Sequence, residues 1–371
     1  MDLYKTLTNL DINLGDRCNL KCVACPCWLV PNPMRVDGNM LGERLSEILG
    51  FIEERCPTFE KIMIIGGEPF THPGLQEFLY NQTFNIYLTI YTNFAVKLKY
   101  EEWPENVHFI TSLDAADDET YRRIRGAETY QLTRNNIQKY TPWIIHADTT
   151  VSKSNLCQLS AIREITRPVN CTHWFLPVDP RMLRYMGNAI SPQDGVAPHP
   201  RAQTVQATAD SLREMLLDDD DLSAVERFFE GLGEYELTND FDMFQGVYLS
   251  GIRHFADLQG YGDRCAVDTP QYAEQHSCPG IRKYMEVTLD SEGKFIPVVH
   301  CPELRQMLHL RRKSYFDTFP CLGPEFANFA DLFAWEAEQR QHPGCRVFCA
   351  RTQYLGVDEY MKSFSDVLKA S

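Results

Sequence analysis

Three cysteines near the amino end constrain this chain more than any other feature. Cys18, Cys22 and Cys25 lie on one short loop that follows the apolar, strand-like residues 10–14. A loop this short can turn three thiolates toward one soft metal centre. Thiolates are the usual ligands of iron–sulfur clusters, and four of them normally hold one four-iron cluster. Three ligands leave one iron open, and an open iron can bind and reduce a small molecule.

A zinc site is the alternative interpretation of the same loop. Zinc normally requires four protein ligands and often uses two Cys-x-x-Cys pairs. Cys27 is the nearest further thiol, but its Cys-Pro-Cys spacing from Cys25 places it poorly for the same centre. We therefore favour a cluster over zinc, and we interpret Cys27 as a spare thiol or a residue that faces the substrate.

The spacing of Cys18, Cys22 and Cys25 resembles the CxxxCxxC motif of the radical S-adenosylmethionine (radical SAM) superfamily. The resemblance implies a [4Fe-4S] cluster on these three residues, with its open iron chelated by the amino and carboxylate groups of S-adenosylmethionine (SAM). In that family the reduced cluster cleaves the sulfonium, and the 5′-deoxyadenosyl radical takes a hydrogen atom from the substrate. An electron donor such as flavodoxin or ferredoxin is then expected as a partner.

Strand-like and helix-like segments alternate through the first half of the chain. The predicted strands are residues 10–14, 61–65, 86–93, 107–114, 144–151 and 172–178. The predicted helices between them are residues 40–56, 74–81, 119–124, 132–140 and 156–165. This alternation predicts an α/β fold with a parallel sheet and right-handed crossovers. The count fits the partial (β/α)6, TIM-like barrel that the resemblance implies.

The character of the sequence changes after this region. We predict a radical SAM core over residues 1–180, a mainly helical connecting region over 181–264 and an auxiliary-cluster domain over 265–371. Within the connecting region, helices are expected at 205–217 and 222–232, with the acidic run 218–221 as a solvated break before the second. The aromatic residues of 239–258 are interpreted as core rather than as a substrate platform.

The turn Gly66-Gly67-Glu68 ends the second predicted strand. Glycines there let the backbone approach a ligand closely, and Glu68 could accept hydrogen bonds from an ammonium group. The alternative is an ordinary turn with a solvated acid. The turn resembles the GGE motif of the family, which implies that these three residues bind the amino group of SAM.

Polar residues end several of the other predicted strands, where ligands of parallel α/β sheets bind. Each could equally cap a helix. The segment 112–114 resembles the SxD segment near the SAM ribose, and 150–155 resembles a fifth-strand segment that also lines the SAM pocket. The cofactor-binding candidates at this edge are Asn93, Ser112, Asp114, Thr150, Ser152 and Asn155. Arg125-Gly126 also occurs at a matching place in many relatives, and we assign it no catalytic role.

Six cysteines lie in the last third of the chain. They surround a hairpin predicted over residues 285–299, and they resemble the SPASM and twitch extensions, which hold two and one auxiliary clusters. The full SPASM pattern has seven cysteines, and here Val298 stands where one of them would fall. At least one auxiliary iron–sulfur cluster is predicted, with buried thiols or zinc as the alternative. The proposed ligands are Cys278, Cys301, Cys345 and Cys349, with Cys265 and Cys321 in reserve.

The charge, the apolar runs and the cysteine content of the chain argue against several classes of protein. The net charge of −15 argues against an extended nucleic-acid surface, which needs clustered Lys and Arg. No apolar run approaches the roughly 20 residues of a membrane span. The amino end carries no secretion signal, so we expect a cytoplasmic protein without membrane partners. Thirteen cysteines in such a chain indicate metal ligation rather than disulfides.

We therefore expect a radical SAM oxidoreductase that modifies a C–H bond of a small polar natural-product precursor. The chain begins close to its first strand, without the amino-terminal peptide-recognition domain common in peptide-modifying relatives. The alternative is a peptide (RiPP) maturase that forms a crosslink or an oxidised side chain. The non-enzyme alternative is an electron-transfer or zinc scaffold protein. Cys27, His72 and His173 are unranked candidates for a second acid or hydrogen donor.

Overall fold

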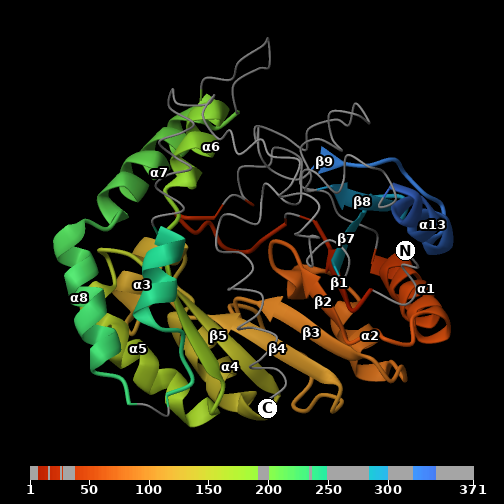
Figure 1. Ribbon diagram of the computed structural model, residues 1–371, viewed down its shortest axis with the longest axis horizontal. Helices are drawn as coiled ribbons and strands as arrows, with labels where there is room; N and C mark the ends of the chain where they lie inside the picture. Colours follow the sequence, from red (N-terminus) through yellow and green to blue (C-terminus); the bar gives the residue numbers. More distant parts are fainter. Residues whose placement is uncertain are drawn as a thin grey trace, which may run out of the picture.

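The predicted α/β fold is confirmed by the computed structural model, shown in Figure 1. The structure describes residues 7–15, 17–25, 27, 38–190, 200–233, 236–248, 284–299 and 321–339. Six parallel strands lie side by side in chain order, as a partial (β/α)6 barrel requires. They are β1 (Asn9–Asn13), β2 (Lys61–Ile65), β3 (Tyr87–Thr92), β4 (Val107–Ser112), β5 (Ile144–Val151) and β6 (Thr172–Pro177).

Helices connect these strands at the predicted places, with ends that differ from the predicted ones by at most three residues. They are α1 (Gly38–Arg55), α2 (Leu75–Asn81), α3 (Asp118–Arg125), α4 (Tyr130–Lys139) and α5 (Leu159–Thr166). Asp117 caps α3 by accepting from the Thr120 amide, and Gly126 ends it in the left-handed conformation. Short 3₁₀ turns complete the connections: η3 (Pro69–Thr71), η4 (Thr141–Trp143), η5 (Leu156–Gln158) and η6 (Arg167–Val169).

The two faces of the sheet differ in chemistry, because successive side chains of a strand point to opposite sides. Alternate residues such as Ile12, Ile64 and Ile90 are at most 1% exposed and join the apolar core beneath the helices. The residues between them are largely polar. We call this second side the polar face and define it by Asp11, Asn13, Thr89, Tyr91, His146, Asp148, Thr172 and Glu286.

The helices after β6 are α6 (Arg181–Ile190), α7 (Ala202–Met215) and α8 (Asp219–Glu230), and residues 241–248 are also helical. Met186 of α6 and Val205 of α7 pack in one cluster with Val23 of the cysteine loop. Phe244 and Tyr248 are buried, so the core interpretation is confirmed for the described part of that segment.

The predicted start of the second helix in this region was wrong. The acidic run is not a break before a helix at residue 222, because α8 begins at Asp219. Asp218 is its N-cap and forms a capping box with Asp221. Carboxylates in the first turn interact favourably with the positive end of the helix dipole, so the run starts the helix instead of preceding it.

The predicted carboxyl-terminal hairpin is confirmed as β7 (Tyr284–Leu289) and β8 (Phe295–Val299). It extends the main sheet, because β7 pairs in parallel with β1. Next follow β9 (Cys321–Leu322) and α13 (Phe329–Gln339), which packs near α1. Of the proposed auxiliary ligands, Cys321 lies in β9, whereas Cys265, Cys278, Cys301, Cys345 and Cys349 lie outside the described residues. The auxiliary cluster and the division into three domains therefore stay predictions.

In the part of the chain that the structure describes, no helix combines the length and apolar character needed to cross a membrane.

Candidate metal and cofactor site

The cysteine loop is hydrogen-bonded to the Gly66-Gly67-Glu68 turn beyond the ends of β1 and β2. The amide of Gly67 donates to the Gly15 carbonyl at 2.9 Å, and the amide of Glu68 donates to the Arg17 carbonyl at 2.9 Å. Gly66 has φ +144°, and a Cβ there would lie 2.6 Å from the Gly15 oxygen. Only glycine fits this position. The two segments predicted to hold the cluster and SAM are therefore fixed against each other.

The surroundings of the three thiols of the loop favour their neutral form over the thiolate. Cys18, Cys22 and Cys25 are free cysteines of intermediate exposure. Burial raises the pKa of Cys18 and of Cys22 to about 12, and the neighbouring thiols add to both effects. A hydrogen bond with Cys27 and burial raise the pKa of Cys25 well above its usual range. Grouped, partly buried thiols become thiolates when a metal centre compensates their charge, so the set fits an iron–sulfur cluster.

The three cysteine sulfurs do not have to converge on a single metal ion to hold a four-iron cluster. Among the described residues, no three Cys, His, Asp or Glu side chains converge closely enough to hold one metal ion. In a four-iron cluster each thiolate binds a different iron, so the ligand sulfurs stay apart.

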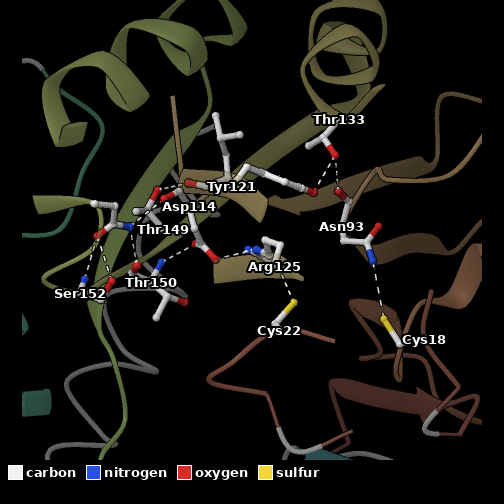
Figure 2. A network of polar contacts seen from close by, with 12 residues as sticks. Cys18, Cys22, Asn93, Asp114, Tyr121, Arg125, Thr133, Thr149, Thr150 and Ser152 are labelled. Carbon is white, nitrogen blue, oxygen red and sulfur yellow. Dashed lines mark hydrogen bonds and ion pairs between the residues drawn. The ribbon is translucent and has the colours of Figure 1, made fainter. Parts of the chain in front are cut away.

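Figure 2 shows how Cys22 is connected to the carboxyl ends of β4 and β5. The Arg125 Nη1 atom lies 3.9 Å from Cys22 Sγ, and Nε of the same side chain lies 2.6 Å from Asp114 Oδ2. Asp114 Oδ1 accepts from the Thr150 amide at 2.7 Å. Both carboxylate oxygens of Asp114, which was predicted to contact SAM, are thus already bonded within the protein. Thr150 and Ser112 remain partly exposed at the same edge.

Cys18 is connected to the end of β3 in a similar way. The Asn93 Nδ2 atom lies 3.8 Å from Cys18 Sγ and donates to Asn19 Oδ1 at 3.0 Å. The amide of Leu20 also donates to Cys18 Sγ, at 3.4 Å. The structure therefore places Asn93 beside a predicted cluster ligand, where an amide N–H can stabilise a thiolate.

Glu68 is 2% exposed, and its carboxylate joins the turn to β3. Oε1 accepts from the Phe70 amide at 3.0 Å and from Thr92 Oγ1 at 2.8 Å, and Oε2 accepts from the Asn93 amide at 2.7 Å. Burial raises the pKa of Glu68 to about 7, while these three donors act in the opposite direction. A contact between this carboxylate and SAM stays a prediction. The structure adds a positioning role, and Gly66, Gly67 and Glu68 line a small pocket with Gly15 and His72.

Asn155 organises the predicted SAM-binding segment after β5. It has no exposed surface, and its Oδ1 accepts from the Ser152 amide at 2.8 Å. Its Nδ2 donates to the carbonyls of Asp114 and Thr150, both at 2.8 Å. Ser152 is buried in the same network. The structure thus brings Asp114, Thr150, Ser152 and Asn155 together, with Asn155 as their common hydrogen-bonding partner.

Replacing Asn155 with alanine is expected to lower the free energy of unfolding by at least about 3 kcal/mol. The variant leaves one buried amide, one buried carbonyl and the partly buried Thr150 carbonyl without this partner, and each such group costs about 1–3 kcal/mol. Urea unfolding measures the change. The matched control is Asn81→Ala. Because the Asn81 side chain is exposed, this substitution should change the free energy of unfolding by no more than about 0.5 kcal/mol. Equal stability of the two variants would contradict the role given to Asn155.

His173, a candidate for a second acid, lies away from the site. It is fully buried on the helix-facing side of β6, where its ring nitrogens bond Thr149 Oγ1 at 2.8 Å and Thr166 Oγ1 at 2.7 Å. Burial lowers its pKa well below the usual range. His72 lines the pocket at the Gly66-Gly67-Glu68 turn.

Two groups of residues were missed from the sequence. The first is Arg125, which was noted without a role. The glycine after it was a signal, because a glycine that ends a helix can let another segment of the chain pack closely there. The second group is on the polar face, where the Tyr91 hydroxyl donates to Asp148 Oδ2 and His146 Nε2 lies 2.8 Å from Asp148 Oδ1. His146 and Asp148 stand on either side of Ala147 in β5, and this local alternation could have identified it.

Comparison with known proteins gives results at three levels. Residues 12–141 match the family described as the radical SAM superfamily. A probable GTP 3′,8-cyclase of Archaeoglobus fulgidus is 30% identical over 138 residues, which are 36% of this chain and 45% of that protein. The chain thus covers about half the length of this curated relative.

Two solved structures show weaker likeness. Streptococcus suis SuiB aligns at 12% identity and a TM-score of 0.44, over 78% of this chain and 60% of that one. A histidine-tagged anSMEcpe with bound AdoMet aligns at 13% identity and a TM-score of 0.45, over 92% of this chain and 79% of that one.

The family match includes part of the site described above, whereas Thr150, Ser152 and Asn155 lie beyond it. Cys18, Cys22, Cys25 and the Gly66-Gly67-Glu68 turn all lie within the matched residues. Residues 12–141, about a third of this chain, therefore form a radical SAM domain.

Proposed function

We propose that this protein is an enzyme that cleaves SAM reductively and oxidises a C–H bond of a small polar molecule. When bound, the cluster and SAM supply a 5′-deoxyadenosyl radical that removes one hydrogen atom. The observation that supports this most is the pairing of a three-thiol loop with the Gly66-Gly67-Glu68 turn at one edge of a parallel sheet. Ligands of such sheets bind at that edge.

The chain's residues take distinct parts in this proposal. Cys18, Cys22 and Cys25 hold the cluster. The backbone of Gly66 and Gly67 receives the amino group of SAM, with Ser112, Thr150 and Asn93 along the same edge. Asp114, Ser152, Asn155 and Glu68 hold these segments in place. Cys278, Cys301, Cys345 and Cys349, with Cys265 and Cys321 in reserve, would hold the auxiliary cluster. When bound, that cluster would supply a site that can accept one electron.

The chemistry of the polar face supports a polar substrate. Asn13 Nδ2 donates to Glu286 Oε1 at 3.2 Å, and Asp11 is the register partner of Glu286 in the β1–β7 pair. Together with Tyr91 and Asp148, these groups offer hydrogen bonds that hydroxyl and amino groups can use. The curated relative is named for a reaction of GTP, which is also a small polar molecule.

Anaerobic reconstitution tests this function. The purified protein is loaded with iron and sulfide, its iron is counted, and 5′-deoxyadenosine is measured with SAM and reduced flavodoxin or ferredoxin. Sugars, aminocyclitols and nucleosides form one substrate panel, and linear peptides form the other. Turnover of the first panel is expected. Turnover of peptides alone would replace the proposal with a peptide maturase, and the absence of any SAM cleavage would favour an electron-transfer or zinc protein. Such a thiol-dependent protein fits the reducing cytoplasm.

A further inference from the structure

The end of α3 contacts the cysteine loop at three consecutive residues. The amide of Val23 donates to the Ile124 carbonyl at 2.9 Å. Gly126 has φ +71°, and a Cβ there would lie 2.8 Å from the Lys21 carbonyl oxygen. Between them, Arg125 reaches Cys22 Sγ. These contacts place the loop and the end of α3 in one fixed arrangement.

Arg125 is itself held in place from the other side. Its side chain is 11% exposed, and its partner Asp114 is 4% exposed. Asp114 is fixed in turn, because Thr150 donates to its carboxylate and Asn155 donates to its carbonyl. The guanidinium is therefore a buried cation that cannot easily turn away from Cys22. Figure 2 shows this chain of contacts from Ser152 to the sulfur.

We propose that Arg125 is a positioning residue that fixes the middle thiolate of the loop and raises the reduction potential of the cluster on it. Asp114 acts through Arg125 and not as a direct SAM ligand. Reduction adds negative charge to the cluster, and a nearby cation with an N–H directed at a ligand sulfur favours the more negative state. The inference rests on the proposed function, because it requires a cluster on Cys18, Cys22 and Cys25.

The test is a potentiometric titration of the reconstituted protein without SAM, so that SAM binding does not enter the result. The fraction of reduced cluster is measured by electron paramagnetic resonance at a series of poised potentials. For Arg125→Gln, the ratio of reduced to oxidised cluster at a given potential should fall at least tenfold, which is about 59 mV for one electron. Arg125→Lys keeps the charge but has one nitrogen in place of the two that contact Asp114 and Cys22, so its fall should be smaller than that of Arg125→Gln.

Arg122→Gln is the matched control. Arg122 lies on the same helix, but its side chain is 59% exposed and pairs with Glu128. This variant should titrate as wild type does. Since a buried carboxylate without its partner is costly, the double variant Asp114→Asn, Arg125→Gln removes both charges and should show the same fall in potential.

The outcomes separate the inference from the function on which it rests. A wild type that loads no cluster would overturn both. A wild type that loads it, with Arg125→Gln and the double variant titrating identically to it, would overturn the inference alone. A third outcome is loss of iron from Arg125→Gln and from the double variant, while their circular dichroism spectra stay unchanged and Arg122→Gln keeps its full iron content. This outcome would support the role of Arg125 in positioning the loop.

Discussion

Replacing Cys22 with alanine lowers the formation of 5′-deoxyadenosine by more than about 100-fold. Mutations of residues that only support metal ligands cost about 10- to 100-fold, and removal of a ligand should cost more. Cys22 is the middle thiol of the loop, and Arg125 and the end of α3 hold it in place. Its loss leaves two thiols for a cluster that needs three. The measurement is the rate of 5′-deoxyadenosine release from reconstituted protein with excess SAM and reductant.

Cys157→Ala is the matched control for this variant. Cys157 is a free, exposed cysteine in η5, outside the loop. It should retain the wild-type rate and iron content. If Cys22→Ala cleaves SAM as fast as Cys157→Ala does, the three-thiol loop is not the metal site and the proposed function fails.

The second large effect is expected for Gly66→Ala. An alanine there adopts a strained backbone conformation, which costs about 1–3 kcal/mol, and its Cβ clashes with the Gly15 oxygen. Relief of the clash moves the turn away from the cysteine loop and weakens the Gly67–Gly15 hydrogen bond. We expect SAM to bind at least about tenfold more weakly, which corresponds to about 1.4 kcal/mol. Equilibrium dialysis of the reconstituted protein measures the affinity.

Gly50→Ala is the control for the glycine substitution. Gly50 lies inside α1, and a Cβ there would meet no atom within 4 Å. Alanine should stabilise that helix by about 0.5–1 kcal/mol and leave SAM affinity unchanged. Wild-type SAM affinity in Gly66→Ala would show that the close contact of the turn with the loop is not needed for cofactor binding.

The order of strands and helices was predictable because each strand is a short apolar run bounded by polar or glycine-rich turns. Residues 61–65 and 144–151 were predicted with the ends that the structure shows. The parallel pairing of β7 with β1 was not predicted. The two strands are separated by about 270 residues, and local periodicity carries no information about such a distant partner.

The candidate site was predictable as a set of residue types but not as a set of contacts. The motifs placed Asp114 and Asn155 at the correct edge of the sheet. Their roles depend on which partners the fold supplies, and Asp114 is bonded to Arg125 and Thr150. The misplacement of His173 had a simpler cause. It shares the helix-facing side of β6 with Phe175, and counting alternate residues from that buried phenylalanine would have excluded it.

The pairing of β1 on both sides has a consequence for biogenesis. The strand that carries the cysteine loop lies between β2 and β7, so its second row of backbone hydrogen bonds forms only after residues 284–289 have been synthesised. Until then, β1 is an unprotected edge on a nascent polypeptide. Firm anchoring of the metal-binding loop thus comes late in translation, and premature termination before β7 would yield a thiol-rich fragment prone to aggregation.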